Sequence, residues 1–192
     1  VQAARAEKFG LSLHDRLVGW LPRYASYAAR VPWLLNARDV IPGAAKLSEA
    51  IAGFSARRSV PKWRGDSFDE SISSSPPIGQ ENAREPESAR EVVLFADTFN
   101  RYFERENLDA ALAVLNAGGY RVHIARPADG SSRPLCCGRT FLSIGKVDEA
   151  RIEAERCLAA LSPFVDRGIP VVGLEPSCLL GFRDEIPALL RS

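Results

Sequence analysis

The sequence lacks a long apolar run and has no excess of either charge. Its 192 residues include 25 Lys and Arg and 24 Asp and Glu, which gives a net charge of +1. A helix that spans a bilayer needs about 20 consecutive apolar residues. Proteins that bind nucleic acid through its phosphates are usually distinctly basic. We therefore expect neither a transmembrane segment nor a nucleic-acid partner.

Common catalytic signatures are also missing. The sequence has only 2 His residues, no Gly-rich phosphate loop and no Ser/His/Asp nucleophile pattern, and residues 138–141 do not match a P-loop. Methionine is absent and the first residue is Val. We therefore expect the chain to be a piece of a longer protein.

The first residues are polar and charged, unlike the apolar centre of a signal peptide. Without an export signal, the four cysteines are expected to be reduced thiols in the cytoplasm, with metal, redox or core roles. A weaker alternative is peripheral contact with a membrane surface, through a helical segment that has Arg16, Arg23 and Arg30 on its polar side.

Residues 91–192 have the pattern of an α/β domain. The apolar run at 92–96 is typical of a strand buried on both faces. Asp97 or Thr98 can then cap a helix. Residues 104–117 and 120–124 predict a helix and a second strand, parallel to the first. The elements expected after these are a helix over 146–167, a strand over 170–174 and a last helix reaching Leu190. The fold class predicted is a small three-layer α/β domain with a parallel sheet.

Residues 1–65 predict an irregular helical segment that connects or docks. Pro22, Pro32 and Pro42 divide it into short pieces, and Ser12 with Asp15 resembles a capping box. We expect its surplus apolar side chains to pack on the α/β domain, or alternatively to meet a partner. They are Tyr24, Tyr27, Val31, Trp33, Leu34 and Leu35. Residues 66–90 are rich in Ser, Pro and Glu and predict a disordered linker.

Cysteine supplies the main chemical signal. Cys136 and Cys137 are adjacent, and Gly138 follows them. Adjacent thiols rarely bond to each other without strain, whereas they can bind one inorganic centre. Glycine allows the positive φ that a close backbone approach requires. Cys178 follows the strand predicted at 170–174, at the strand end where ligands gather in parallel sheets. Because thiolates are the usual ligands of iron–sulfur clusters, we hypothesise that these three cysteines bind one.

Two alternatives remain open for the cysteine trio, and the fourth cysteine has an interpretation of its own. The trio can be incidental free thiols. Zinc can bind three thiolates together with a carboxylate or His123, although the usual C-x2-C pairs are absent. Cys157 lies on the apolar stripe of a predicted helix, and we expect it to be a small core residue.

The Cys-Cys-Gly motif resembles the cysteine-rich CCG domain. Similar domains occur in the iron–sulfur subunits of glycolate oxidase and of anaerobic glycerol-3-phosphate dehydrogenase, and in the cysteine-rich subunit of heterodisulfide reductase. Residues 95–103, 134–141 and 173–178 resemble the C-terminal end of large bacterial FAD-linked oxidases. Those chains combine a flavin domain, a ferredoxin-like domain and a CCG domain. Residues 10–17 and 54–59 resemble the connector in the same proteins.

The resemblance implies an electron-transfer module of an FAD-linked 2-hydroxyacid dehydrogenase, of the D-lactate, glycolate or D-2-hydroxyglutarate type. Cys136, Cys137 and Cys178, with Gly138 beside them, would form the site of a cluster of the 4Fe–4S kind. The partners implied are flavin-containing and ferredoxin-like domains or subunits. FAD would lie on those parts, so this chain is not expected to be catalytic alone.

The sequence departs from the CCG pattern at two positions. Asp97 stands where the first family cysteine is expected, and Glu175 stands where Cys-x-x-Cys would begin. Both carboxylates are possible additional ligands. The alternative implied by these departures is a non-redox docking domain with a degenerate cluster site, which attaches to the flavin and ferredoxin domains.

Overall fold

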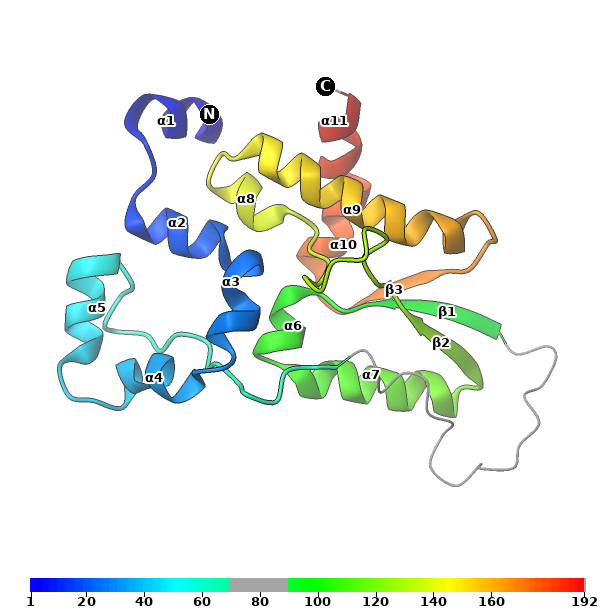
Figure 1. Cartoon of the computed structure of the whole chain (residues 1–192), viewed down its shortest axis with the longest axis horizontal. Helices are drawn as coiled ribbons and strands as arrows, with labels where there is room; N and C mark the ends of the chain where they lie inside the picture. The colour runs from blue at the N-terminus through cyan, green and yellow to red at the C-terminus, as the bar shows by residue number, and fades with distance from the viewer. Residues whose placement is uncertain (70–89, 192) are drawn as a thin grey trace.

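A three-stranded parallel sheet forms the centre of the molecule. The computed structural model describes residues 1–69 and 90–191 (Figure 1). The strands are β1 (Arg90–Phe95), β2 (Tyr120–Ile124) and β3 (Val171–Gly173), in the order β2-β1-β3. β1 pairs in parallel with both neighbours. The predicted α/β class and the parallel pairing of the first two strands are confirmed.

Helices cover both faces of the sheet, which gives three layers (Figure 1). Alternate residues of β1 point to opposite faces because a strand has a period of two. Val92 and Leu94 pack with Leu108 of α7 (Arg105–Ala117). Val93 and Phe95 pack with Leu161 of α9 (Val147–Val165). The strand is buried on both faces, as its apolar run predicts.

The C-terminal end differs from the expected single helix. It forms α10 (Pro176–Arg183) and α11 (Glu185–Arg191), with Asp184 between them. The break has a physical cause, since Pro187 has no N–H and its ring would clash with the Arg183 carbonyl in a continuous helix. Two further short helices, α6 (Thr98–Tyr102) and α8 (Arg139–Ser143), occupy stretches that we expected to be loops.

The N-terminal segment is helical, as predicted. Its elements are α1 (Gln2–Phe9), α2 (Leu13–Gly19), α3 (Leu21–Ala28), α4 (Pro32–Asn36), η1 (Ala37–Asp39) and α5 (Ala44–Ala52). The capping box of α2 is present. The Ser12 hydroxyl accepts a hydrogen bond from the Asp15 N–H at 3.1 Å, and the Asp15 carboxylate accepts one from the Ser12 N–H at 3.2 Å. None of the described helices is long and apolar enough to cross a membrane.

Two of these helices dock on the α/β unit. α2 packs on α8, where a Cβ on Gly19 would overlap the side chain of Ile144. α3 packs on α6, with Ala25 and Ala29 beside the buried Tyr102. This part of the segment follows our expectation.

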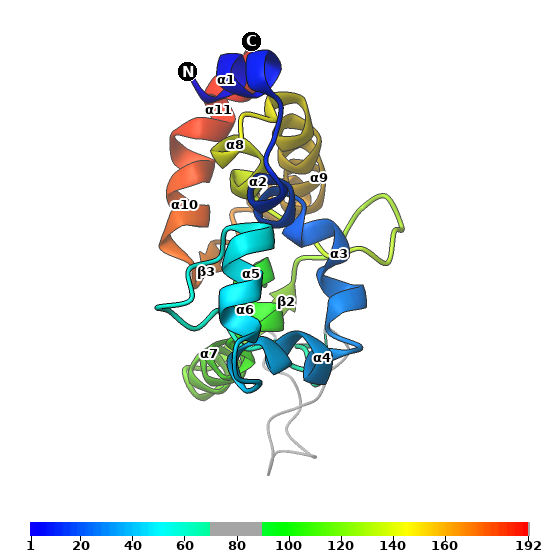
Figure 2. The same ribbon diagram turned by 90° about the vertical axis from the view of Figure 1, so that its left-hand side faces the viewer.

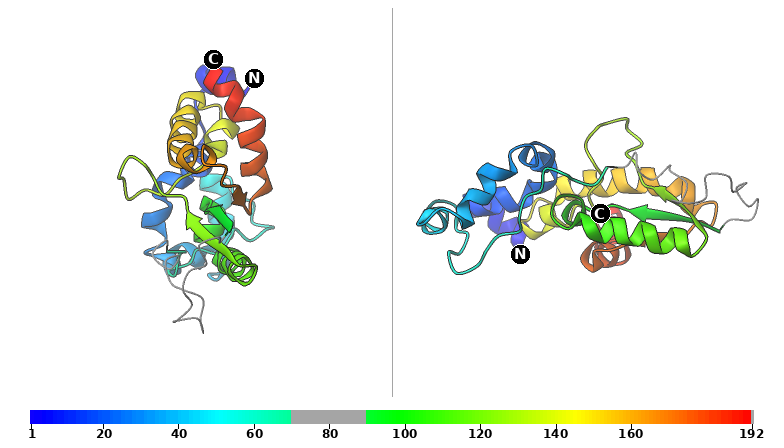
Figure 3. Two further views of the ribbon diagram at one scale, coloured as in Figure 1. Left: turned by 90° about the vertical axis from the view of Figure 1, so that its right-hand side faces the viewer. Right: turned by 90° about the horizontal axis from the view of Figure 1, so that it is seen from below.

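The outer helices do not pack on the α/β unit as we expected. α4 and α5 lie beyond the end of the sheet, as the view from below makes clear (Figure 3). Tyr27, Val31, Trp33 and Leu34 are exposed, so the expectation that they pack on the α/β domain is wrong. Short helices placed away from the sheet have no neighbouring surface large enough to cover these side chains.

Phe68 is a packed residue within the range that we predicted to be a linker. Its side chain is buried against the sheet, and its N–H and carbonyl both bond to Arg101, each at 3.0 Å. Packed structure therefore reaches into the range 66–90 that we predicted to be a linker. The larger part of that range, residues 70–89, lies outside the described residues.

Candidate functional site

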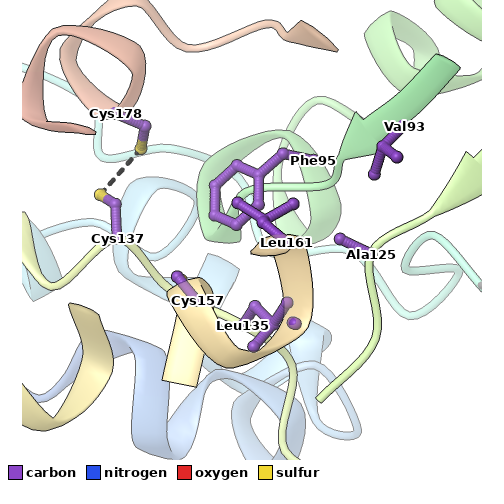
Figure 4. Packing of buried hydrophobic residues seen from close by; sticks show 9 residues of the cluster. Val93, Phe95, Ala125, Leu135, Cys137, Cys157, Leu161 and Cys178 are labelled. Atoms are coloured by element: carbon purple, nitrogen blue, oxygen red, sulfur yellow. Dashed lines mark hydrogen bonds between the residues drawn. The ribbon is translucent and has the colours of Figure 1, made fainter. Parts of the chain in front are cut away.

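Two distant loops bring their thiols together. Cys136 and Cys137 precede α8, and Cys178 lies in the first turn of α10, just after β3. The sulfur atoms of Cys137 and Cys178 are 3.0 Å apart (Figure 4). All four cysteines are free thiols. The predicted meeting of these two segments is therefore observed, although Cys178 lies in a helix and not in the loop that we expected. The role of the thiols as cofactor ligands stays a prediction.

The thiols lie in a dry environment. Cys136, Cys137 and Cys178 are only 4–6% exposed. Cys137 and Cys178 belong to the apolar cluster around Phe95 (Figure 4). Cys157 is fully buried in the same cluster, and its thiol donates to the Cys136 carbonyl at 3.0 Å. Its predicted place in the core is confirmed.

This environment favours protonated sulfur. The neighbouring Cys136 lowers the pKa of Cys137, but the contact with Cys178 and burial outweigh this effect and raise it to about 12. The hydrogen bond with Cys137, together with burial, raises the pKa of Cys136. Burial likewise raises the pKa of Cys157. Because metals bind thiolates, a metal at this site would have to displace protons.

Gly138 shapes the loop. It has φ +82° and begins α8, and a Cβ at this position would lie 2.7 Å from the Ala150 carbonyl of α9. The positive φ agrees with the sequence argument. The close neighbour that requires glycine is the backbone of α9.

The two carboxylates that stand where the CCG pattern has cysteines act as helix caps. Asp97 Oδ1 accepts from the N–H groups of Phe99 and Asn100, at 2.9 and 3.1 Å, and Oδ2 accepts from the Asn100 amide at 2.6 Å. Glu175 Oε1 accepts from the Ser177 N–H and hydroxyl, at 3.2 and 2.7 Å. Asp97 thus caps α6, whereas we expected a cap for the helix over 104–117, and Glu175 caps α10.

The side chains fit a cluster only in part. Three thiols have the right donor chemistry for iron, but both carboxylates already accept the hydrogen bonds of helix caps. Across residues 1–69 and 90–191, no three His, Cys, Asp or Glu side chains are arranged to hold a metal ion. His123, the possible zinc ligand, bonds to Glu91 at 2.8 Å. This arrangement is not a four-ligand set, and no electron-transfer step follows from it.

The geometry also departs from a zinc site. Tetrahedral zinc with bonds of 2.3 Å holds two sulfurs about 3.8 Å apart. The 3.0 Å between Cys137 and Cys178 is shorter, so the loops would have to separate to admit the ion.

One buried charged site was not predicted from the sequence. Glu153 of α9 is fully buried and accepts from Arg133 at 2.7 Å and from Arg156 at 2.9 Å. Arg23 of α3 lies 3.8 Å from it and also pairs with Glu149. We call these charges the Glu153 junction, since they link α3 to α9. The sequence holds one signal for the burial of Glu153. Glu153 lies three residues after Ala150 and four before Cys157, which places it on the buried stripe of α9.

The fold and site define a small parallel α/β domain with a buried thiol group, joined to a helical segment. This chain is similar to D-2-hydroxyglutarate dehydrogenase from Pseudomonas putida, with 30% identity over 180 residues. The match covers 90% of this chain and 17% of the relative, so the chain spans about a sixth of the relative's length. The similarity supports a relationship to a 2-hydroxyacid dehydrogenase.

Two further comparisons give no match. No protein-family model matches the chain, and no solved structure matches it.

Proposed function

We propose that this chain is an accessory module of an FAD-linked 2-hydroxyacid dehydrogenase of the D-2-hydroxyglutarate type. The observation that carries the proposal is the similarity over 90% of the chain, which includes both the helical segment and the α/β unit. The module docks on the part of the enzyme that bears FAD and the substrate site. It does not oxidise substrate by itself.

The outer helices support the docking role. We define the outer apolar surface as the exposed apolar side chains of residues 27–51, which are Tyr27, Val31, Trp33, Leu34, Val40, Ile41, Leu47 and Ile51. α4 and α5 face outward together at one end of the molecule (Figure 2). Groups of exposed apolar side chains mark interaction sites in soluble proteins. The occupant we assign to this surface is the flavin-bearing part of the dehydrogenase.

A chimeric enzyme tests the proposal. This chain replaces the matching segment of the Pseudomonas putida dehydrogenase, and D-2-hydroxyglutarate oxidation is measured per bound flavin. We expect the chimera to keep at least about a tenth of the parent rate, a loss of roughly 1.4 kcal/mol in transition-state stabilisation. Deletion of the segment should abolish turnover. A folded chimera as inactive as the deletion would contradict the proposal.

A matched pair of variants tests the surface. Leu34→Glu with Ile51→Glu places two charges on the outer apolar surface. Val114→Glu with Ile152→Glu places two charges on exposed positions of α7 and α9. We expect only the first pair to lower the chimera's rate by tenfold or more. If the two pairs lowered the rate equally, the outer apolar surface would not be the docking surface.

An iron–sulfur electron-transfer role is the second candidate. The meeting of Cys137 and Cys178 favours it. Cys136, Cys137 and Cys178 would supply three thiolates, and a bound cluster would supply one-electron transfer. Asp97 and Glu175 would remain helix caps. In this reading too, the module serves the flavin-bearing and ferredoxin-like parts of the enzyme.

Metal analysis separates the candidates. Iron, zinc and acid-labile sulfide are measured per chain on anaerobically purified protein. A cluster predicts stoichiometric iron and sulfide that Cys137→Ser removes and Cys157→Ser retains. Zinc without iron would indicate a structural metal. Protein that stays free of iron after cluster reconstitution would leave docking as the remaining candidate function.

A further inference from the structure

The two closest thiols come from segments far apart in the chain. Cys137 and Cys178 are 41 residues apart in sequence, and their sulfurs are 3.0 Å apart (Figure 4). A disulfide requires a sulfur separation of about 2.05 Å. The two sulfurs therefore need to approach by only about 1 Å, because they already point at each other.

The other two cysteines have different surroundings. Cys136 is next to Cys137 in sequence, where a disulfide is strained. Its sulfur accepts the Gly138 N–H at 3.4 Å. The Cys157 thiol donates to a carbonyl oxygen. The contact of 3.0 Å joins Cys137 and Cys178, so these two thiols are the pair placed to form a disulfide.

We propose that Cys137 and Cys178 form a redox-sensitive dithiol that closes to an intramolecular disulfide. The bond would join the loop before α8 to the first turn of α10. This inference goes beyond the accessory role and does not depend on the docking surface. It also makes oxidation and metal binding mutually exclusive, since both use the same two sulfurs.

Hydrogen peroxide is the oxidant that we assign. One sulfur attacks a peroxide oxygen, the O–O bond breaks, and a sulfenic acid forms with release of water. The second sulfur attacks the sulfenic sulfur and displaces a second water. Two thiols and one peroxide thus give one disulfide and two waters, and the two electrons lost by sulfur reduce the peroxide. A dithiol reductant reverses the bond by exchange.

Burial sets the rate. Both sulfurs are at most 6% exposed, so closure should be slower than oxidation of an exposed thiol pair. Closure also encloses α8, α9 and β3 within one covalent loop. A cross-link over 41 residues restricts the unfolded chain, so we expect the midpoint of thermal unfolding to rise by about 5–10 °C.

The test uses the full chain, freed of metal by a chelator and treated with hydrogen peroxide or with dithiothreitol. Free thiols are alkylated in denaturant and counted by mass spectrometry. We expect the peroxide-treated chain to lose two of its four thiols. A peptide that links Cys137 to Cys178 should be lighter by two hydrogens and should disappear after reduction.

Variants complete the test. Cys157→Ser should still lose two thiols, whereas Cys178→Ser should form no intramolecular disulfide. Four free thiols after peroxide, a link between any other pair, or sulfinic acid without a link would overturn the inference. The wild-type measurement stands even where a variant fails to fold. An inactive chimera would leave this result unchanged, so the two proposals fail separately.

Discussion

The α/β unit and the outer helices use apolar residues in opposite ways. Leu94 of β1 is fully buried between the sheet and α7. Trp33 and Ile51, in α4 and α5, are 72% and 63% exposed. Burial of apolar surface is the main favourable term in folding. The packed core of the protein therefore lies in the α/β unit, whereas the outer helices leave apolar side chains exposed.

A substitution in the Glu153 junction should have the largest effect on the free energy of unfolding. Glu153→Ala leaves Arg133 and Arg156 without their buried carboxylate, which costs about 3–5 kcal/mol of unfolding free energy. Urea unfolding at pH 7 measures the change. Glu155→Ala, an exposed position on the same helix, should change stability by less than about 0.5 kcal/mol. Similar losses in both variants would show that the junction is not a buried structural link.

A pair of leucines tests the comparison itself. Leu94→Ala removes a fully buried side chain and should cost about 3 kcal/mol, because it leaves a cavity. Leu34→Ala, at a position that is 54% exposed, should cost less than about 0.5 kcal/mol in the isolated chain. Denaturant unfolding of both variants is the measurement. A large loss for Leu34→Ala would mean that the outer apolar surface is part of the folding core.

Gly138→Ala tests the loop that carries the thiols. The left-handed backbone and the overlap with the α9 carbonyl should together cost about 2–3 kcal/mol. Gly130→Ala is the control, since Gly130 has φ +67° and open space around its Cβ position, and it should cost only about 1 kcal/mol. Thermal unfolding compares the two. Equal losses would mean that α9 can move away from the loop.

Loss of the capping box of α2 should have the smallest effect on stability, and this effect should depend on pH. The hydrogen bond from Ser12 lowers the pKa of Asp15 below its ordinary value of 3.8. This stabilising contribution is therefore present above about pH 4 and is lost as the pH falls through the lower folded pKa. Ser12→Ala should cost a few tenths of a kcal/mol at pH 7, because the pair is exposed to solvent. Unfolding at pH 7 and pH 3 should give a smaller difference at pH 3, and a constant difference would contradict this role of Asp15.

Local patterns in the sequence predict much of the fold. The run at 92–96 indicates β1, and Ser12 and Asp15 predict the start of α2. Asp97 is predicted to be a helix cap, although for the helix over 104–117 and not for α6. Each of these features depends on residues within about one turn or one strand, where propensity and hydrogen bonding are local. The topology of parallel strands also predicts that the Cys178 loop faces the Cys137 loop.

Features that depend on the arrangement of distant elements could not be predicted in the same way. The exposure of Trp33 follows from where α4 lies relative to the sheet, which no local pattern specifies. Glu153 is paired by Arg133 from a distant loop, with Arg23 of α3 nearby. Glu175 acts as a helix cap because α10 begins at Pro176. A position that resembles a cluster-ligand position therefore stabilises the start of a helix instead.

Amide hydrogen exchange on residues 31–52 directly tests the proposal that the outer helices dock on the flavin-bearing part of a dehydrogenase. Exchange is measured in the isolated chain and in the chimera, with α7 as the internal reference. We expect amides of α4 and α5 to exchange at least tenfold more slowly in the chimera, while those of α7 stay unchanged. Equal exchange of α4 and α5 in the two proteins would contradict it.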